Sequence, residues 1–167
     1  MPFVTAFYRA LGTGMVISVD SPIDDKVRSA MESLIEDYEH VLSRFRNDSL
    51  IAAIGKAEHG GSFDFPDWCA PLFDLYDALF SATSGAIDPC VGEDLIRLGY
   101  DASLSFTVTQ DAPEHLGALR GRAVWGRDVT RHGTTLVTHE PVQLDFGAAA
   151  KAISSICSGA CCSRHNS

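Results

Sequence analysis

Apolar residues between Val27 and Phe45 recur at intervals of three and four, the spacing of one face of an α-helix. The residues that follow this spacing are Val27, Ala30, Met31, Leu34, Ile35, Tyr38, Val41, Leu42 and Phe45. Ser21 stands before this run as a candidate N-cap, with Pro22 in the first helical position and Asp24 in the first turn. We therefore predict an amphipathic helix that begins after Ser21 and packs its apolar face into the core.

A second helix is predicted by another apolar stretch, which starts at about Asp67 or Pro71 and runs to Thr83. Gly85 follows it as a C-terminal cap, since glycine adopts the left-handed conformation that often ends a helix. The residues expected to face inward are Leu72, Leu75, Tyr76, Leu79 and Phe80.

Strands are predicted on both sides of these helices. "GMVISVD" is rich in β-branched and apolar residues, and the short "AFYRAL" stretch is its expected partner. The stretch "RAVWGRDVTRHGTTLVTHEPVQLDFG", residues 122–147, is expected to form short strands separated by turns at His132-Gly133 and Glu140-Pro141.

The last predicted strand, "VQLDF", leaves through Gly147 into three alanines and Lys151. A glycine and small residues let a ligand approach the backbone, and a helix N-terminus offers free N–H groups to phosphate oxygens. We therefore predict a phosphate site at this corner. The alternative is an ordinary strand-to-helix turn with a solvated lysine.

Composition predicts one globular domain, since 46% of the 167 residues are hydrophobic. Thirteen basic and 22 acidic residues give a net charge of −9, which argues against a nucleic-acid partner. A dinucleotide remains a candidate ligand, because a divalent cation can neutralise its pyrophosphate. No apolar run approaches the roughly 20 residues of a membrane span, and no signal peptide is recognisable. We therefore expect no membrane span and a cytoplasmic protein.

Composition changes after Ile156, where "CSGACCSRHNS" loses apolar periodicity. We expect one domain over residues 1–156 and an aberrant or disordered tail over 157–167, which a frameshift could have produced. The tail holds three of the five cysteines and His165, but in a spacing that matches no familiar zinc site. An odd cysteine count without a secretion signal also does not indicate disulfides, so free thiols are predicted.

Two further pairs of residues are candidates for binding phosphate or a metal ion. Arg44 and Arg46 stand beside small polar residues and could face either a phosphate or solvent. His132 and His139 could meet across a hairpin, but without a third metal ligand we expect surface residues.

Four segments in order, "ALGTGMVISV", "SRFRNDSLIAAI", "TSGAIDPCVG" and "VQLDFGAAAKA", resemble the motifs of the FAD:protein FMN transferases, the ApbE-like family. The likeness runs from Ala10 to Ala152 at comparable separations. It implies an α/β (α+β) fold in which antiparallel sheet and packed helices form two layers, related to the T-fold. Family members are substantially longer, so the fold is expected to be incomplete, with an exposed edge or association into a homo-oligomer.

The resemblance also implies an activity. The family uses FAD and a divalent metal, usually magnesium, to move FMN onto a Thr or Ser of a target protein, with AMP leaving. By resemblance, Gly147 to Lys151 receive the pyrophosphate, the backbone carbonyl near Ala150 binds the metal, and Lys151 holds a phosphate oxygen. The further nucleotide-contacting residues that it implies are Gly12, Thr13, Ser49, Asp88 and Asp145. For three of them the alternatives are a turn hydroxyl at Thr13, a helix cap at Ser49 and a loop-stabilising carboxylate at Asp88.

The chain departs from the family pattern in ways that leave its own turnover open. Ala148 and Ala152 stand where the family usually has glycine, and an added methyl group can keep a phosphate from the backbone. The downstream metal ligands and a downstream histidine of the family have no match. A non-catalytic FAD- or nucleotide-binding module, or an inactive truncated fragment, is therefore the alternative to an active transferase.

Overall fold

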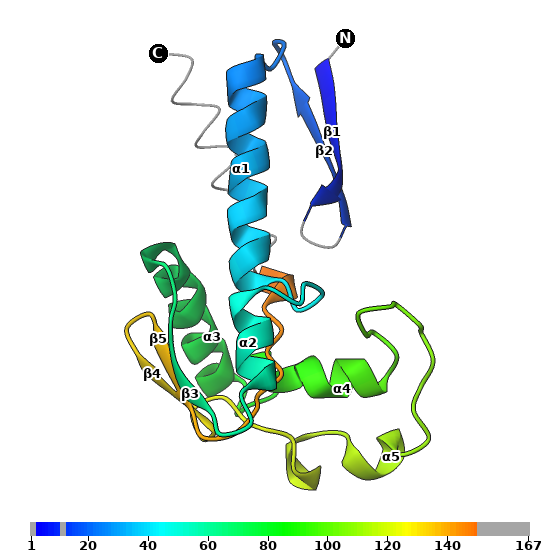
Figure 1. The fold of residues 1–167 in the computed structure, drawn as a ribbon, viewed down its shortest axis with the longest axis vertical. Helices are drawn as coiled ribbons and strands as arrows, with labels where there is room; N and C mark the ends of the chain where they lie inside the picture. Colours follow the sequence, from blue (N-terminus) through cyan, green and yellow to red (C-terminus); the bar gives the residue numbers. More distant parts are fainter. Residues whose placement is uncertain (1–2, 11–12, 150–167) are drawn as a thin grey trace.

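The computed structural model describes residues 3–10 and 13–149, which form α-helices and antiparallel strands (Figure 1). The strands are β1 (Phe3–Ala10), β2 (Thr13–Val19), β3 (Gly61–Asp64), β4 (Val129–His132) and β5 (Thr135–Thr138). The α-helices are α1 (Asp25–Leu42), α2 (Leu50–Lys56), α3 (Ala70–Ala82), α4 (Gly92–Arg97) and α5 (Ala112–His115). Short 3-10 turns are η1 (Asp67–Cys69), η2 (Pro89–Val91) and η3 (Ala118–Arg120).

The strands form two separate antiparallel sheets. β1 and β2 make a hairpin in which Phe3 pairs with Val19, and β3, β5 and β4 lie in that order in a second sheet. The hairpin lies along the first half of α1, whereas the second sheet lies beside α3 at the other end of the molecule (Figure 1). The predicted class, helices packed with antiparallel sheet, is confirmed.

Helix α1 begins at Asp25, three residues later than the predicted first helical residue, Pro22. Its N-cap is Asp24, whose carboxylate accepts a hydrogen bond from the backbone N–H of Val27 at 2.8 Å. Ser21 lies outside the helix, so its assignment as N-cap is wrong; the acidic side chain closer to the apolar run takes this position. The predicted apolar face is buried at Val27, Met31, Ile35, Tyr38 and Leu42, while Ala30 is exposed.

Helix α3 confirms the second predicted helix. Its C-cap is Thr83, and the N–H of Gly85, which has a φ of +83°, donates to the Phe80 carbonyl. One inward-facing assignment is wrong: Leu75 is 41% exposed. Phe73, which was not predicted to face inward, is fully buried instead.

The β4–β5 hairpin confirms the turn predicted at His132-Gly133, since Gly133 has a φ of +65°. The predicted strand "VQLDF" is wrong: residues 141–146 form no strand and pair with no strand of the described chain. Their backbone bonds go to the η2 turn instead, from Gly92 N–H to the Gln143 carbonyl and from Asp145 N–H to the Pro89 carbonyl. A helical turn begins at Gly147, as predicted.

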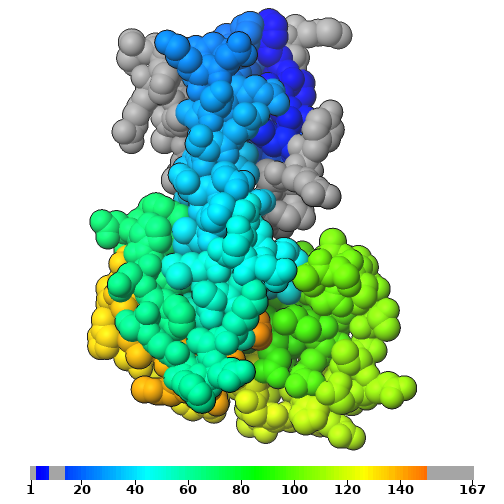
Figure 2. Space-filling view, in the orientation of Figure 1, coloured from blue at the N-terminus to red at the C-terminus, as the bar shows by residue number. Residues whose placement is uncertain are grey.

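Two hydrophobic clusters hold the described chain together. The larger one surrounds Phe73 and Phe146 and joins the helices to the β3–β5–β4 sheet. The smaller one, formed by Phe7, Val27, Met31 and Ile35, lies between the hairpin and the first half of α1. Helix α1 therefore links both clusters, and Figure 2 shows the start of α1 and the hairpin above a broader body.

Candidate functional site

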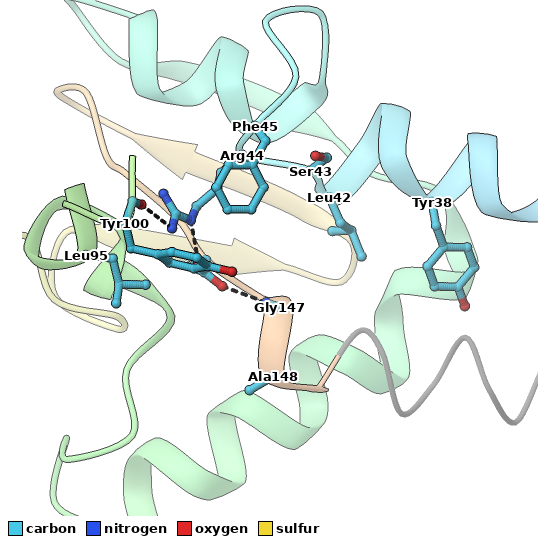
Figure 3. Close-up of a pocket in the computed structure, with 10 residues that line it drawn as sticks. Tyr38, Leu42, Ser43, Arg44, Phe45, Leu95, Tyr100, Gly147 and Ala148 are labelled. Carbon is cyan, nitrogen blue, oxygen red and sulfur yellow. Dashed lines mark hydrogen bonds and ion pairs between the residues drawn. The ribbon is translucent and has the colours of Figure 1, made fainter. Parts of the chain in front are cut away.

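A pocket of about 270 Å³ lies where the end of α1, the region after α4 and the 145–148 corner meet (Figure 3). Its lining consists of Tyr38, Leu42, Ser43, Arg44, Phe45, Leu95, Tyr100, Asp145, Gly147 and Ala148. These residues come from three parts of the chain that are far apart in sequence, so only the fold brings them together.

A buried ion pair forms the polar part of the pocket. Arg44 Nε lies 2.5 Å from Asp145 Oδ2, and a second guanidinium nitrogen donates to the Tyr100 carbonyl at 2.6 Å. Both charged side chains are nearly buried, at 8% and 13% exposure. The guanidinium also packs on two rings, 4.4 Å from the centroid of Phe45 and 4.6 Å from that of Tyr100. Arg44 therefore faces neither solvent nor a free phosphate position, and its charge is neutralised.

The other carboxylate oxygen of Asp145 fixes the corner. Oδ1 accepts a hydrogen bond from the Gly147 N–H at 2.7 Å. A Cβ added at Gly147 would lie 2.9 Å from this oxygen, closer than a carbon can approach it without a shift. Within the described residues, the space beside Gly147 thus accommodates the chain's own carboxylate, and the approach of a ligand to this backbone stays a prediction.

The charge of Asp145 also affects the phenol of Tyr76. Burial raises the pKa of Tyr76 to about 12, and the negative charge of Asp145 adds to this shift. The Tyr76 ring packs edge-on against Phe146, with the centroids 5.2 Å apart. The Tyr76 phenol therefore stays protonated near neutral pH.

Two of the predicted nucleotide contacts lie outside the pocket lining. Ser49 is 2% exposed and caps α2 by accepting from the Ala52 N–H at 3.1 Å. Asp88 is buried, accepts from the backbone of Cys90 and Trp125, and pairs with Arg122 at 3.1 Å. Both side chains have the structural roles named as alternatives, and nucleotide contact by them stays a prediction.

The remaining predicted residues are placed only in part. Thr13 is the first residue of β2. Gly12, Ala150 and Lys151 lie outside the described residues. Of the predicted set, the structure therefore brings Asp145 and Gly147 together in the pocket.

Sequence reasoning missed the aromatic part of the site. Phe45 directly follows Arg44 in the second motif, and this adjacency was a usable signal, because arginine often packs on an aromatic face. Tyr100 and Leu95 lie between the third and fourth motifs, and no local pattern singles them out.

Metal-binding groups do not gather in the described part of the chain. Over residues 3–10 and 13–149, no group of three or more His, Cys, Asp or Glu side chains could hold a metal ion. His132 lies at the turn end of the β4–β5 hairpin, whereas His139 follows the other end of β5, so the two do not meet. Among the same residues, no helix is both long and apolar enough to cross a bilayer.

Solved structures of flavin transferases share the fold of this chain. The fold matches the flavin transferase ApbE from Vibrio cholerae with a TM-score of 0.78 at 19% identity, over 95% of this chain and 52% of that one. The apo flavinyl transferase ApbE of Pseudomonas stutzeri matches with a TM-score of 0.68 at 20% identity, over 95% and 54%. An ApbE protein from Thermotoga maritima matches with a TM-score of 0.69 at 18% identity, over 96% and 52%.

A match to a protein-family model shows which family the chain belongs to. The model of the ApbE family matches residues 11–156, and the chain belongs to this family. No curated protein matches the sequence. The chain spans about half the length of the solved structures that it resembles.

Proposed function

We propose that this chain is the FAD-binding part of a flavin transferase that moves FMN from FAD to a Thr or Ser of an acceptor protein. The observation that carries the proposal is the family match over residues 11–156, which includes the corner where Asp145 and Gly147 line a pocket. FAD is thus the proposed substrate, and a flavin-acceptor protein the proposed partner.

The pocket chemistry supports a ring-binding role. Arg44 is the cation in its described lining, and Asp145 already neutralises it. The remaining lining is largely aromatic and aliphatic, with Tyr38, Phe45 and Tyr100 as its rings. Such a lining suits a flat ring of FAD better than its charged pyrophosphate. We propose that the pyrophosphate lies further along the corner, toward Lys151.

The proposed reaction is a phosphoryl transfer. The acceptor hydroxyl oxygen forms a bond to the FMN phosphorus, the bond from that phosphorus to the bridging oxygen breaks, and AMP leaves with the electron pair. The hydroxyl proton passes to a base or to solvent. Lys151 is proposed to hold a phosphate oxygen, where its positive charge would stabilise the developing negative charge.

Magnesium dependence is part of the proposal by resemblance. The described residues do not fit a preformed magnesium site, because they contain no cluster of acidic ligands and both oxygens of Asp145 are already hydrogen-bonded. We therefore assign no step to the metal. The cytoplasmic location and association into a homo-oligomer likewise stay predictions.

The test is chromatographic detection of AMP and FMN after incubation with FAD, with and without magnesium. Lys151→Ala should abolish AMP release, whereas Lys56→Ala should not, because Lys56 is exposed and donates to the Asn47 carbonyl away from the pocket. Turnover that survives in Lys151→Ala would contradict the proposed role of this residue.

A second candidate is a non-catalytic FAD- or nucleotide-binding module. Ala148 favours it, because this residue lines the pocket where the family usually has glycine, and an added methyl group can keep a phosphate from the backbone. Saturable FAD binding without AMP release, whether or not magnesium is added, would select this candidate over the transferase.

A further inference from the structure

A second buried arginine lies outside the pocket and contacts none of its lining. Arg122 is 7% exposed and precedes β4. Its Nη1 lies 3.1 Å from Asp88 Oδ2 and its Nε lies 2.9 Å from Asp94 Oδ2. The two carboxylates are also largely buried, at 3% and 13% side-chain exposure. One guanidinium thus joins two carboxylates that would otherwise repel each other in a poorly solvated place.

These two carboxylates mark the ends of one short segment. Asp88 caps η2 through the Cys90 N–H, and Asp94 lies in the first turn of α4. Asp94 also accepts from the Gly117 N–H at 3.0 Å, which ties the segment to the chain just before η3. Arg122 therefore holds residues 88–94 at both ends.

The 88–94 segment in turn holds the pocket corner. The Asp145 N–H donates to the Pro89 carbonyl at 2.7 Å, and the Gly92 N–H donates to the Gln143 carbonyl at 3.1 Å. A Cβ added at Gly92 would lie 2.5 Å from the Gln143 carbonyl oxygen, so the two stretches are in direct backbone contact. Leu95, one residue past the segment, lines the pocket itself.

We infer that Arg122 is a positioning residue for the pocket: by joining Asp88 to Asp94 it fixes the segment that places the Asp145 backbone and Leu95. This inference rests on the proposed function for its ligand, FAD, but not for its geometry. Without Arg122, two buried carboxylates lose their shared cation and move apart or take up water. The Asp145 carboxylate then loses its alignment with Arg44 and the Gly147 N–H.

The chain offers a control for this arginine. Arg131 also joins two carboxylates, Asp74 at 2.7 Å and Asp77 at 2.5 Å, and its side chain is 17% exposed. Both acidic partners lie on α3 and are more exposed than Asp88 and Asp94, at 69% and 47% of their side chains. Asp77 reaches the 88–94 segment only indirectly: it accepts from Trp125 Nε1 at 2.6 Å, and the Trp125 N–H donates to Asp88 at 3.3 Å. Arg122→Met and Arg131→Met therefore each remove one bridging cation and retain an unbranched side chain.

FAD affinity is measured by fluorescence quenching under conditions where urea unfolding shows each variant folded. We expect Arg122→Met to weaken FAD binding about tenfold. The 88–94 segment would shift, and the pocket residues that it positions would then fit FAD less well, although Arg122 itself does not contact the ligand. Arg131→Met should bind as the wild type does, and Arg122→Lys should recover most of the affinity, since an ammonium still separates the carboxylates. Equal affinities for the two Met variants, or no recovery with Lys, would overturn the inference.

A ligand-free measurement separates this inference from the proposed function. Backbone hydrogen exchange at Gly92 and Asp145 should be faster in Arg122→Met than in the wild type and unchanged in Arg131→Met. If Arg122→Met does not fold, Asp94→Asn, which removes one of the two ion pairs, should show the same direction at Gly92. A wild-type chain that binds no FAD would refute the proposed function alone, whereas unchanged exchange at both amides would refute the role of Arg122.

Discussion

At the scale of single residues, Asp145 connects three parts of the site. It pairs with Arg44 through one oxygen and with the Gly147 N–H through the other, while its own N–H reaches Pro89. A buried charge that loses its partner is costly, because the remaining charge stays poorly solvated.

Asp145→Asn should therefore destabilise the protein by about 3 kcal/mol, since Arg44 is left buried without a counter-charge. The matched control is Glu32→Gln, because Glu32 pairs with Arg28 on the surface at 3.1 Å with 51% of its side chain exposed. The control should change stability by less than about 1 kcal/mol. Urea unfolding measures the free energy of unfolding of both variants. A similar decrease in the two would show that the buried ion pair contributes no more to stability than the surface pair.

The two described thiols give a pH dependence. Burial raises the pKa of Cys69 from 9.0 to about 12 and also raises that of Cys90, with the charge of Asp88 adding to the second shift. Above about pH 9 the unfolded chain releases these protons while the folded chain keeps them, so stability falls by up to about 1.4 kcal/mol per thiol for each pH unit. Cys69→Ala should make the decline measured by urea unfolding between about pH 9 and 11 less steep. An unchanged slope would mean that Cys69 does not contribute.

The residue scale also shows what local sequence can reveal. The glycine and small residues after Asp145 predict that a ligand approaches the backbone there. The approaching group within the described residues is the Asp145 carboxylate itself, and its partner Arg44 lies 101 residues away in sequence. Such a pairing depends on the whole fold, so spacing along the chain could not predict it.

At the scale of elements, the start of α1 depends on one cap. Asp24→Ala should destabilise the protein by about 1 kcal/mol, because the Val27 N–H loses its acceptor and the helix N-terminus loses a negative charge. Ser21→Ala, at the position first assigned as the cap, should be neutral. Thermal unfolding of the two variants checks this, and the reverse order would restore the earlier assignment.

The segment 142–146 shows why a pattern predicts burial better than pairing. Val142, Leu144 and Phe146 are buried and alternate with less buried residues, as in a strand. The alternation of apolar residues in this segment therefore agrees with the burial of their side chains. The backbone partner is a 3-10 turn instead of a strand, and alternation carries no information about the partner.

At the scale of the whole molecule, the described chain has two parts, and hydrophobic clusters of different size stabilise them. The hairpin is two-stranded and rests on a small cluster with the first half of α1, whereas the rest shares the large cluster. Phe3, Val4 and Val16 are 48%, 62% and 69% exposed, so much of its apolar surface is uncovered. A two-stranded hairpin is marginally stable by itself.

Backbone hydrogen exchange should therefore be faster in β1 and β2 than in β5, because opening the hairpin exposes only the small cluster. Met31→Ala, in the small cluster, should accelerate exchange in the hairpin while leaving β5 unchanged. Leu136→Ala, in the large cluster, should accelerate β5. Uniform protection across all three strands would show a single cooperative unit instead.

Family and fold class followed from four motifs in order, because each motif carries residues that the family shares over a long stretch. The division into two sheets and the aromatic lining of the pocket did not, since both depend on contacts between the motifs. The proposed function depends above all on FAD binding in the pocket at the Asp145–Gly147 corner.

Equilibrium dialysis of FAD against the wild type, Gly147→Ala and Gly133→Ala tests this binding most directly. At Gly147 the added methyl group lies 2.9 Å from the Asp145 carboxylate, whereas at Gly133 it meets nothing within 4 Å and only strains a backbone with a φ of +65°. We expect saturable binding to the wild type and to Gly133→Ala, and about tenfold weaker binding to Gly147→Ala. Equal binding by all three proteins, or no saturable binding by the wild type, would contradict this expectation.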